Sequence, residues 1–543
     1  DQAQVISDSE KSAQDIYKKI NEITQMIDQQ KAIDENILLE LQTGAYDFNN
    51  PLIIVNPYQI SPLTAIILFR SPTPVKINIH IKGKTIEADV DYSINQSTTE
   101  HILPIYGLYA GIVNQVTISM SDNQNNVTEK TFDVETEALM PSLSMNKLHI
   151  YKSGLKISPG FTFSYDSGNY QYTKSAFDLE GDYRWYLTKS FSAIGNYSNG
   201  KSLWVDYGDP YGKDLFLELN YLGKILNVYY SPYGNHHDIE LTESSLLMTG
   251  SNNTPNTIED FIYSIDRTTG LINHSLSYLD VLQRSRRYGV LYSNKDWMHM
   301  NSIVEHDDGV IVSSNYQSSI IFNDWNGNLK WILSDPALYT SAYQKYLLKP
   351  IGTNFLYPYN QHAAEILPDT DNNPDTIDII VFDNGSSRTF VDAELQRKIK
   401  ALEIIEPPLF SRMVQYQINE KDMTVKQIWQ YGQDRPELFA KVRGDADLLS
   451  NGNYLGTFFI DLANEDSFTQ HTAYVEIDAN QQVVWECIAT SSNEQNSYTD
   501  YRAERFEIYN ESSIDLKVGI KANNFIPLEL LQKAQDFKNK GDK

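Results

Sequence analysis

The stretch FNDWNGNLKW, residues 322–331, decides the fold, because it reads as two short strands joined by a tight Asp/Asn/Gly turn. The same pattern recurs five more times, with a second strand that often ends in an aromatic residue. The other copies are FDLEGDYRW (177–185), LNYLGKIL (219–226), IDRTTGLI (265–272), INEKDMTV (418–425) and IDANQQVVW (477–485). Hairpin units of this kind cannot bury their faces alone, so six copies predict a six-bladed β-propeller. A two-sheet sandwich is the competing fold.

Two further segments precede the repeats. Ile16, Ile20, Ile23 and Ile27 recur at helical spacing and predict a helix over residues 7 to about 42. The stretch VKINIHI, residues 75–81, alternates with period two and predicts part of a small β-sandwich. After Pro527 we expect a short helix start followed by a frayed end. The predicted domains are an N-terminal helical segment (1–45), a β-sandwich (46–140), the propeller (141–510) and a C-terminal extension (511–543).

The composition supports an all-β protein and limits its partners. The chain has 36 Tyr, 21 Phe and 7 Trp, and aromatic residues favour strands. Its 71 acidic and 44 basic residues give a net charge of -27, which repels phosphate backbones and anionic lipids. We therefore expect no nucleic-acid binding. No apolar run is long enough to span a bilayer, and the start DQAQ carries no export signal; a mature chain would begin this way, although composition alone does not decide it.

Several chemistries are excluded by the residues that are missing. The single cysteine, Cys487, allows no internal disulfide and no Cys-rich metal site, and we interpret it as a small buried apolar residue. Its surroundings, CIAT (487–490), lack the pattern of a formylglycine sulfatase. No Gly-rich strand-to-helix motif is present that could bind the phosphates of a nucleotide sulfate donor. We expect no cofactor.

Three histidines stand in the same phase of the repeats. HDIEL (237–241), HMNSI (299–303) and HAAEI (362–366) each place an aliphatic residue four positions after the histidine, at intervals of 62 and 63 residues. Equal phase in equivalent blades places the imidazoles at one height on innermost strands, which line the channel of a propeller. We expect His237, His299 and His362 to converge there. His236 is not in this phase, so we choose His237.

Other interpretations of these histidines stay open. A histidine at the start of a strand often only satisfies a turn, but three in register argue against that. The later stretch GDADL (444–448) lacks a histidine, so the blade does not require one. Three imidazoles could bind zinc with an open position, although no His-x-His or His-x-x-x-His spacing is present. We expect no metal.

Motifs in both domains carry a family resemblance. In the first domain they are NPY (56–58), SPLTAI (61–66) and PIYGLY (104–109). In the second they are HHD (236–238), DWMHMNS (296–302), NQHAA (360–364), FDNG (382–385) and SRMVQY (411–416). On these residues the chain resembles the bacterial arylsulfate sulfotransferases over nearly its whole length. The resemblance implies a propeller behind a β-sandwich, a homodimer, and a location outside the cytoplasm.

The resemblance also implies an activity and roles for residues. In this family a channel histidine takes the sulfuryl group from an aryl sulfate donor and passes it to a phenolic acceptor. By resemblance His362 is the nucleophile, while His237 and His299 handle the phenolic proton and the sulfuryl oxygens. Asn301 is a neutral donor beside them. Tyr501 is a candidate for contacting the aryl ring, although a surface position is the simpler interpretation.

One departure from the family pattern concerns charge. The family has an arginine in a Ser-Ser-Arg stretch after the second histidine, whereas this chain reads SSNYQ (313–317). Asn315 therefore offers a hydrogen bond without a charge, unless Arg443 or Arg412 takes the place of the arginine. The paired cysteines of the family are also missing. Two other functions stay open: a ligand-binding surface propeller without activity, and a metal-dependent propeller hydrolase or lyase.

Overall fold

The computed structural model is built mostly of β-strands, with one long helix at each end of the chain. Of the described helices, none combines the length and the apolar character that crossing a membrane requires. The structure describes residues 8–164, 173–191, 195–198, 202–207, 214–252, 256–284, 295–388, 397, 401, 409–464, 467–491, 498–508, 519 and 521–541.

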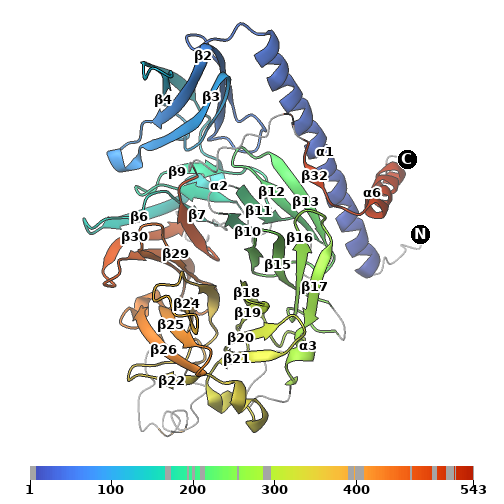
Figure 1. The fold of residues 1–543 in the computed structure, drawn as a ribbon, viewed down its shortest axis with the longest axis vertical. Helices are drawn as coiled ribbons and strands as arrows, with labels where there is room; N and C mark the ends of the chain where they lie inside the picture. The colour runs from blue at the N-terminus through green and yellow to red at the C-terminus, as the bar shows by residue number, and fades with distance from the viewer. Residues whose placement is uncertain are drawn as a thin grey trace.

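Helix α1 (Asp8–Thr43) confirms the predicted N-terminal helix, and Ile16, Ile20, Ile23 and Ile27 are its buried face. It runs along one side of the molecule and lies beside α6 (Leu528–Gly541) (Figure 1). The side chain of Asn21 donates to the backbone carbonyl of Ala534 over 2.8 Å. The expectation of a frayed end is therefore wrong: packing on α1 keeps the C-terminal segment helical to Gly541.

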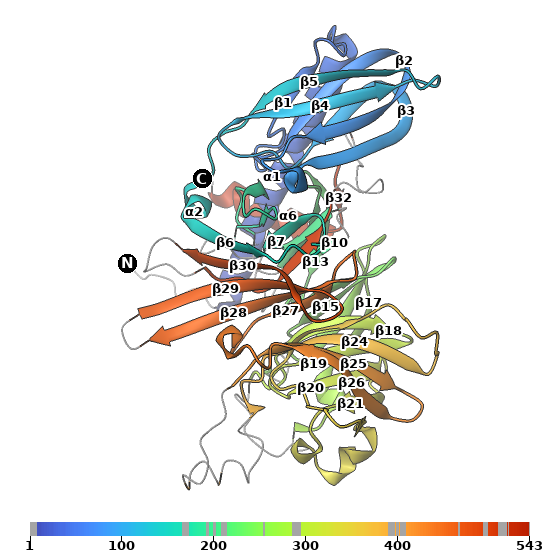
Figure 2. The same ribbon diagram turned by 90° about the vertical axis from the view of Figure 1, so that its left-hand side faces the viewer.

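The predicted β-sandwich region forms one branched sheet. Its strands are β1 (Leu52–Val55), β2 (Ala65–Ile81), β3 (Val90–Ile105), β4 (Val113–Ser121) and β5 (Val127–Glu135). Strand β3 pairs with β2 along its length, while β1 and then β4 pair with the opposite edge of β2. The first part of β2 is buried on both faces, and its second part alternates as predicted. Figure 2 shows this domain above the rest of the chain.

The remaining strands form six sheets, numbered here from the first along the chain. Sheet 1 contains β31 (Ala503–Phe506), β7 (Phe161–Ser164), β8 (Ser175–Phe177) and β9 (Tyr183–Tyr186). Sheet 2 contains β10 (Gly195–Ser198), β11 (Ser202–Asp206), β12 (Asp214–Leu219), β13 (Ile225–Ser231) and β32 (Asn523–Asn524). Sheet 3 contains β14 (Ile239–Leu241), β15 (Ser245–Gly250), β16 (Phe261–Asp266) and β17 (Ile272–Ser277).

The other three sheets follow the same plan. Sheet 4 contains β18 (Met300–His306), β19 (Gly309–Ser314), β20 (Ser319–Asp324) and β21 (Leu329–Leu333). Sheet 5 contains β23 (His362–Ile366), β24 (Thr376–Asp383), β25 (Arg412–Asn419), β26 (Thr424–Tyr431) and β22 (Lys349–Ile351). Sheet 6 contains β27 (Asp445–Leu448), β28 (Tyr454–Asn464), β29 (Ser467–Ile477), β30 (Val483–Ser491) and β6 (Asn146–Lys152). Among the described short helices, η1 (Ile86–Ala88) lies between β2 and β3, and α2 (Pro141–Ser144) lies between β5 and β6. Those between strands of the six sheets are α3 (Tyr278–Val281), η3 (Pro336–Leu338), η4 (Ser341–Tyr346) and η5 (Pro436–Leu438).

Each of the six sequence repeats is the hairpin between the third and fourth strands of its sheet, as predicted. In each turn, the side-chain oxygen of the first polar residue accepts hydrogen bonds from backbone N–H groups. Asp324 Oδ1, for example, accepts from the N–H groups of Asn326 and Asn328. A later residue takes a left-handed backbone, and Gly327, with φ of 82°, does so at no steric cost. The six sequence repeats thus reflect the residues that each hairpin turn requires.

Buried apolar clusters join the sheets in chain order, and Figure 1 shows the sheets following one another in that order. Sheets 2 and 3 share one cluster, sheets 3 and 4 a second, sheets 4 and 5 a third, and sheets 5 and 6 a fourth. The largest cluster includes residues of sheets 6, 1 and 2, and Phe177 stacks on Trp485 across sheets 1 and 6. Cys487 is buried there, as expected. The late strand β31 pairs with β7, and the early strand β6 pairs with β30.

Candidate active site

The three predicted histidines lie at the starts of neighbouring first strands. His237 precedes β14, His299 precedes β18, and His362 is the first residue of β23. His237 and His299 have φ values of 69° and 48°, a left-handed conformation that non-glycine residues rarely adopt. The backbone of His299 is fixed in this turn because its N–H donates to Asp296 Oδ1 over 3.1 Å. Strained backbone held by its surroundings is typical of functional sites.

The structure brings the three imidazoles together. The ring centroids of His237 and His299 are 4.9 Å apart, and their Nε2 atoms are 3.2 Å apart. The centroids of His237 and His362 are 6.5 Å apart. Neighbouring strands of three sheets therefore deliver one cluster of imidazoles, as the common phase of the sequence predicts.

His362 is held as a neutral imidazole in a single tautomer. Asn384 Nδ2 donates to the carbonyl oxygens of Ala440 and Arg443 over 2.8 and 2.6 Å. Because its amide hydrogens are used there, Asn384 presents Oδ1, which accepts from His362 Nδ1 over 2.7 Å. Burial lowers the pKa of His362 to about 3, so the ring is uncharged at neutral pH. Its Nε2 then carries the lone pair.

His299 is held in the opposite protonation state. Its Nδ1 lies 2.6 Å from Glu259 Oε2 and 2.8 Å from Asp296 Oδ2. Burial alone lowers the pKa of His299, but the hydrogen bonds to Asp296 and Glu259 outweigh burial and raise the pKa to about 9. The ring also stacks on Tyr316, with centroids 4.5 Å apart. At neutral pH His299 is an imidazolium.

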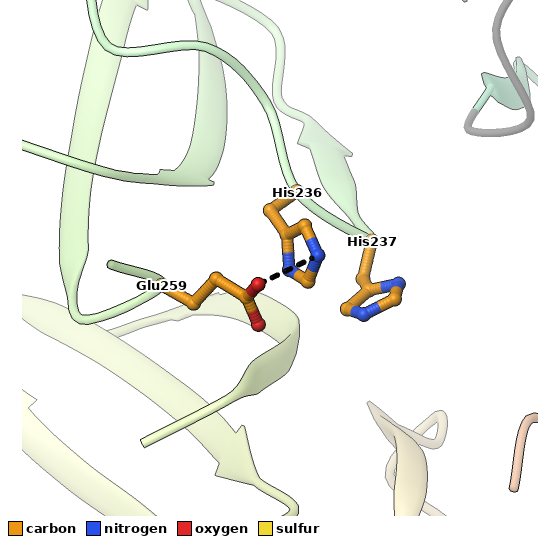
Figure 3. Close-up of side chains that lie close together, drawn as sticks. All are labelled: His236, His237 and Glu259. Carbon is orange, nitrogen blue, oxygen red and sulfur yellow. Dashed lines mark ion pairs between the residues drawn. The ribbon is translucent and has the colours of Figure 1, made fainter. Parts of the chain in front are cut away.

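His236 and His237 point in different directions, which supports the choice between them. His236 turns toward Glu259, with 3.1 Å between Nε2 and Oε1, whereas His237 turns away from this carboxylate (Figure 3). The ring of His237 lies nearly parallel to that of Tyr501, with centroids 4.9 Å apart. Burial, followed by the nearby histidines, holds the pKa of His237 well below its usual value, so this ring is neutral.

Tyr501 is part of the cluster, so the interpretation of Tyr501 as a surface residue is wrong. Only 8% of it is exposed, and its ring centroid lies 5.8 Å from that of His362. Its hydroxyl has no hydrogen-bond partner within the described part of the chain. The next residue, Arg502, donates to Asp238 Oδ1 over 2.7 Å and to the carbonyl of His237 over 3.0 Å. Sheet 1 thereby contributes an aromatic ring and a cation beside the histidines.

The predicted polar residues lie around His362. Asn301 Nδ2 donates to the carbonyl of Gln361 over 2.8 Å, and Asn315 Nδ2 donates to the carbonyl of Asn360 over 2.7 Å. Both side chains therefore support the segment that leads into His362. The guanidinium of Arg443 lies 5.0 Å from the Phe459 ring centroid, in the turn before β27.

Arg412 does not reach the cluster. Its guanidinium is fully buried and donates to Asp383 Oδ2 over 2.8 Å and to the carbonyl of Leu356 over 3.0 Å. A buried arginine paired in this way supports the packing of sheet 5. Of the two arginines considered as a replacement cation, Arg412 is therefore excluded.

A second group of ionisable residues lies on the first strands β14, β23 and β27. This carboxylate cluster consists of Glu240, Glu365, Asp445 and Asp447. Burial, followed by the charge of Asp238, raises the pKa of Glu240 to about 8, and burial raises that of Asp445 to about 6. Burial and then Asp445 raise the pKa values of Glu365 and Asp447 well above the usual range. At pH 7 Glu240 therefore holds a proton, whereas Asp445 is mostly ionised.

Four sets of described side chains bring possible metal-binding atoms within 4.8 Å of one another, and three of them include one of the predicted histidines or residues of the carboxylate cluster. These three are His236, His237 and Glu259; Glu259, Asp296 and His299; and Glu365, Asp445 and Asp447. In the second set His299 Nδ1 forms a hydrogen bond of 2.8 Å with Asp296 Oδ2 and an ion pair of 2.6 Å with Glu259 Oε2. A coordinated ion would separate its ligands further. We therefore interpret this set as an ion pair and a hydrogen bond.

Sequence reasoning missed four residues that hold this site. Asp296 and Asn384 stand in two of the motifs quoted for the family resemblance, so their polar side chains were visible there. Arg502 follows Tyr501 directly. Glu259 lies in the connection before β16, outside every repeat and motif, and only the folded chain places it between His236 and His299.

Comparisons with known proteins identify the family. A family model described as "Arylsulfotransferase (ASST)" matches residues 134–502, and one described as "Arylsulfotransferase Ig-like domain" matches residues 52–137. Proteins named arylsulfate sulfotransferase AssT from Lelliottia amnigena and Escherichia coli O6:H1 are 25% and 24% identical to this chain over 500 residues, which cover 70% of this chain and 80% of each relative. A solved structure from Bacteroides thetaiotaomicron, of unknown function, covers 82% of this chain and is itself covered completely, at 10% identity and a TM-score of 0.28, which is too low to support an argument. Because the first family model spans more than half of the sequence, this chain belongs to the arylsulfotransferase family.

Proposed function

We propose that this protein is a sulfotransferase that moves a sulfuryl group from an aryl sulfate ester to a phenolic acceptor. The observation that carries the proposal is the pairing of a neutral His362 with a cationic His299 in one cluster, within a chain of the arylsulfotransferase family. The relatives named above are arylsulfate sulfotransferases by name. A neutral imidazole is a competent nucleophile near pH 7, and a nearby cation favours an anionic substrate.

We propose that the six sheets are the blades of a closed propeller spanning residues 141–510, behind a β-sandwich at 46–140. The shared clusters that lead from each sheet to the next support this arrangement. So does the pairing of β31 with β7, because the end of the chain then completes the first sheet. The first strands of the sheets would line the channel, with the histidines at one of its ends.

In the proposed mechanism His362 carries the group between two phenols. Its Nε2 attacks the sulfur, the bond from sulfur to the phenolic oxygen breaks, and the electron pair leaves with that oxygen. Nδ1 keeps its hydrogen, which it donates to Asn384 Oδ1, so the adduct is a sulfated imidazolium. The neutral imidazole is then a good leaving group in the second step. The acceptor phenol then attacks the same sulfur and restores His362. The reaction is ping-pong, with a sulfohistidine intermediate.

The other residues would bind and orient the substrates. His299 and His237 handle the phenolic proton and the sulfuryl oxygens, and Tyr501 contacts the aryl ring. Sulfuryl transfer, like phosphoryl transfer, spreads charge over three equatorial oxygens, so donors around the sulfur stabilise the transition state. Asn301, Asn315 and Arg443 are the remaining candidates for such donors.

The test is intact-mass analysis after brief exposure to 4-nitrophenyl sulfate without an acceptor. We expect the protein to gain the mass of one sulfuryl group, and to lose it when a phenol is added. The matched control is the His362→Asn variant, which keeps a polar group of similar size. A protein that releases the phenol without gaining mass would transfer the group directly, and double-reciprocal plots for donor and acceptor would then intersect instead of running parallel.

Two other functions are separated by simple measurements. A ligand-binding propeller would bind aryl sulfates without turnover when a phenol is present. A metal-dependent hydrolase or lyase would lose activity after exhaustive chelation, and the grouping of His236, His237 and Glu259 makes that control necessary. The sulfotransferase proposed here keeps its activity after chelation.

We also propose that the protein acts as a homodimer outside the cytoplasm. The family resemblance supports both statements. Light scattering at the peak of a size-exclusion run would test the dimer, because the measured mass should be twice that of one chain.

A further inference from the structure

One nitrogen of His299 lies between two carboxylates. Nδ1 is 2.6 Å from Glu259 Oε2 and 2.8 Å from Asp296 Oδ2, and ionised carboxylates only accept hydrogen bonds. Nδ1 must therefore carry a hydrogen. Glu259 is 2% exposed and reaches His299 from the connection before β16, so it holds the ring from a different sheet.

The other nitrogen of His299 faces a histidine. Its Nε2 is 3.2 Å from His237 Nε2, so one of these two nitrogens must donate and the other must accept. His237 is buried next to Arg502, whose charge opposes a proton on its ring. His299 is therefore the donor, which makes it an imidazolium whose second proton lies on the side of His237 and His362.

The charged and titratable groups around His299 agree with this assignment. Glu259 and Asp296 face it on one side, and both favour the charged ring. Its other titratable neighbours are imidazoles held neutral by burial, namely His236, His237 and His362. The Tyr316 ring stacks on its face.

We propose that Glu259 is a positioning residue that holds His299 with its proton on the His237 side, so that His299 gives this proton to the departing phenol oxygen and takes one back from the acceptor phenol. The proposal rests on the sulfotransferase function and adds the group that sets the proton transfer. In the first half-reaction the proton moves from His299 Nε2 to the oxygen that leaves sulfur. In the second half-reaction the acceptor's hydroxyl proton returns to Nε2, so no other reactant is required.

The chemistry of phenols suits this pair. A side-chain phenol has a pKa of about 10, and the pKa of His299 is about 9. A proton moves efficiently in both directions between groups of similar pKa, whereas an unassisted histidine near 6.5 would be a poor base toward the acceptor. Glu259 thus brings the pKa of His299 close to the pKa values of the departing and the accepting phenol.

The experiment compares two donors with the Glu259→Gln variant. Phenyl sulfate has a poor leaving group that needs the proton, and 4-nitrophenyl sulfate has a good one that does not. In a ping-pong reaction kcat/KM for the donor reports only the first half-reaction. We expect kcat/KM for phenyl sulfate to fall about 100-fold and kcat/KM for 4-nitrophenyl sulfate to fall less than about 10-fold, since general acid catalysis contributes 10²-fold or more. Glu259→Asp should recover part of the loss. Equal losses with both donors, or no loss, would overturn the proposal.

The matched control is a carboxylate that holds a histidine elsewhere. Glu420 accepts from His306 at the far end of β18, with both oxygens 3.1 Å from Nε2. Glu420→Gln should leave the ratio of the two rates unchanged. If Glu259→Gln does not fold, Asp296→Asn tests the same nitrogen from its other side and should shift the ratio in the same direction.

A second measurement does not depend on activity. In the ligand-free protein, NMR titration of His299 should give a pKa that falls by about one unit or more in Glu259→Gln, because a charge-assisted hydrogen bond is lost. An unchanged His299 pKa overturns the proposal. If the wild-type protein transfers no sulfuryl group but this pKa falls, the proposed function fails while the clamp on His299 stands.

Discussion

The histidines and the carboxylate cluster both lie at first strands and share two of them, β14 and β23, yet their protons are controlled in different ways. Asn384 fixes the tautomer of His362, and Glu259 and Asp296 fix the charge of His299. Asp445 Oδ1 and Asp447 Oδ2, in contrast, have no hydrogen-bond partner in the described part of the chain. The histidine end of the proposed channel is thus organised by specific partners, whereas the carboxylates of the cluster raise one another's pKa values.

This difference separates a reactive region from a passive one. A histidine held in one protonation state by neighbours of fixed geometry needs no reorganisation when the reaction starts. The carboxylates share protons whose positions no neighbour specifies. On a chain with a net charge of -27, the cations that can attract an anionic sulfate ester are concentrated at the histidine end, where His299 and Arg502 lie.

The largest expected effect tests the histidine side of the comparison directly. His362→Ala should lower turnover by about 10³-fold or more and abolish the sulfated form, because no other nucleophile stands in its place. The melting temperature should stay close to that of wild type. If the folded variant keeps more than trace turnover, His362 is not the nucleophile. The contrast between a reactive histidine cluster and a passive carboxylate cluster would then fail.

A smaller effect is expected for the assisting histidine. His299→Ala should slow steady-state transfer by about 10² to 10³-fold but still allow slow sulfation of His362 from 4-nitrophenyl sulfate, because His299 assists an attack that it does not perform. Intact-mass spectra at increasing times should show the sulfated form appearing late. Wild-type rates in this variant would take His299 out of the site.

The third prediction tests whether the hydroxyl of Tyr501 belongs to the reactive region. Tyr501→Phe keeps the ring that stacks on His237 and removes a buried hydroxyl without a partner among the described residues. If this hydroxyl binds a substrate oxygen, kcat/KM should fall about 10-fold, the value of one hydrogen bond of about 1.4 kcal/mol. Tyr501→Leu should cost more, because it also removes the stacked ring. An unchanged Phe variant would restrict Tyr501 to aromatic contact.

The smallest effect belongs to the carboxylate side. The pKa of Glu240 in the folded protein is about 8, above the ordinary value of 4.5, so between these values the folded state holds a proton that the unfolded chain has lost. This stabilisation is complete below about pH 4.5 and is lost as the pH rises through about 8. In Glu240→Gln the fall in the free energy of unfolding from pH 5 to pH 8 should shrink by on the order of 1 kcal/mol, since partial exposure reduces the full effect.

Chemical denaturation at several pH values measures this slope. The exposed Glu243, in the turn that follows β14, is the matched control, and Glu243→Gln should leave the slope as it is in wild type. A slope that does not change in Glu240→Gln would mean that Glu240 ionises normally, and the contrast between the two clusters would then be lost.

The sequence by itself determined the repeated hairpins and the common phase of the histidines. An Asp or Asn that starts a tight turn acts through the backbone next to it, as Asp324 does, so six such turns can be read without knowledge of the fold. The phase of His237, His299 and His362 is likewise a local property of each repeat. The helix α1 was visible for the same reason, because its buried isoleucines recur at helical spacing.

Only the tertiary structure decided how these residues are charged and oriented. Glu259 reaches His299 from another sheet, Arg502 reaches Asp238 across 264 positions of sequence, and α6 is helical to its end because it packs on α1. Tyr501 looked like a surface residue because no pattern near it shows that the chain returns there to pair with sheet 1 beside the histidines. A pKa depends on burial and on charges within a few ångströms, and in this protein those neighbours come from distant parts of the chain, which no local pattern records.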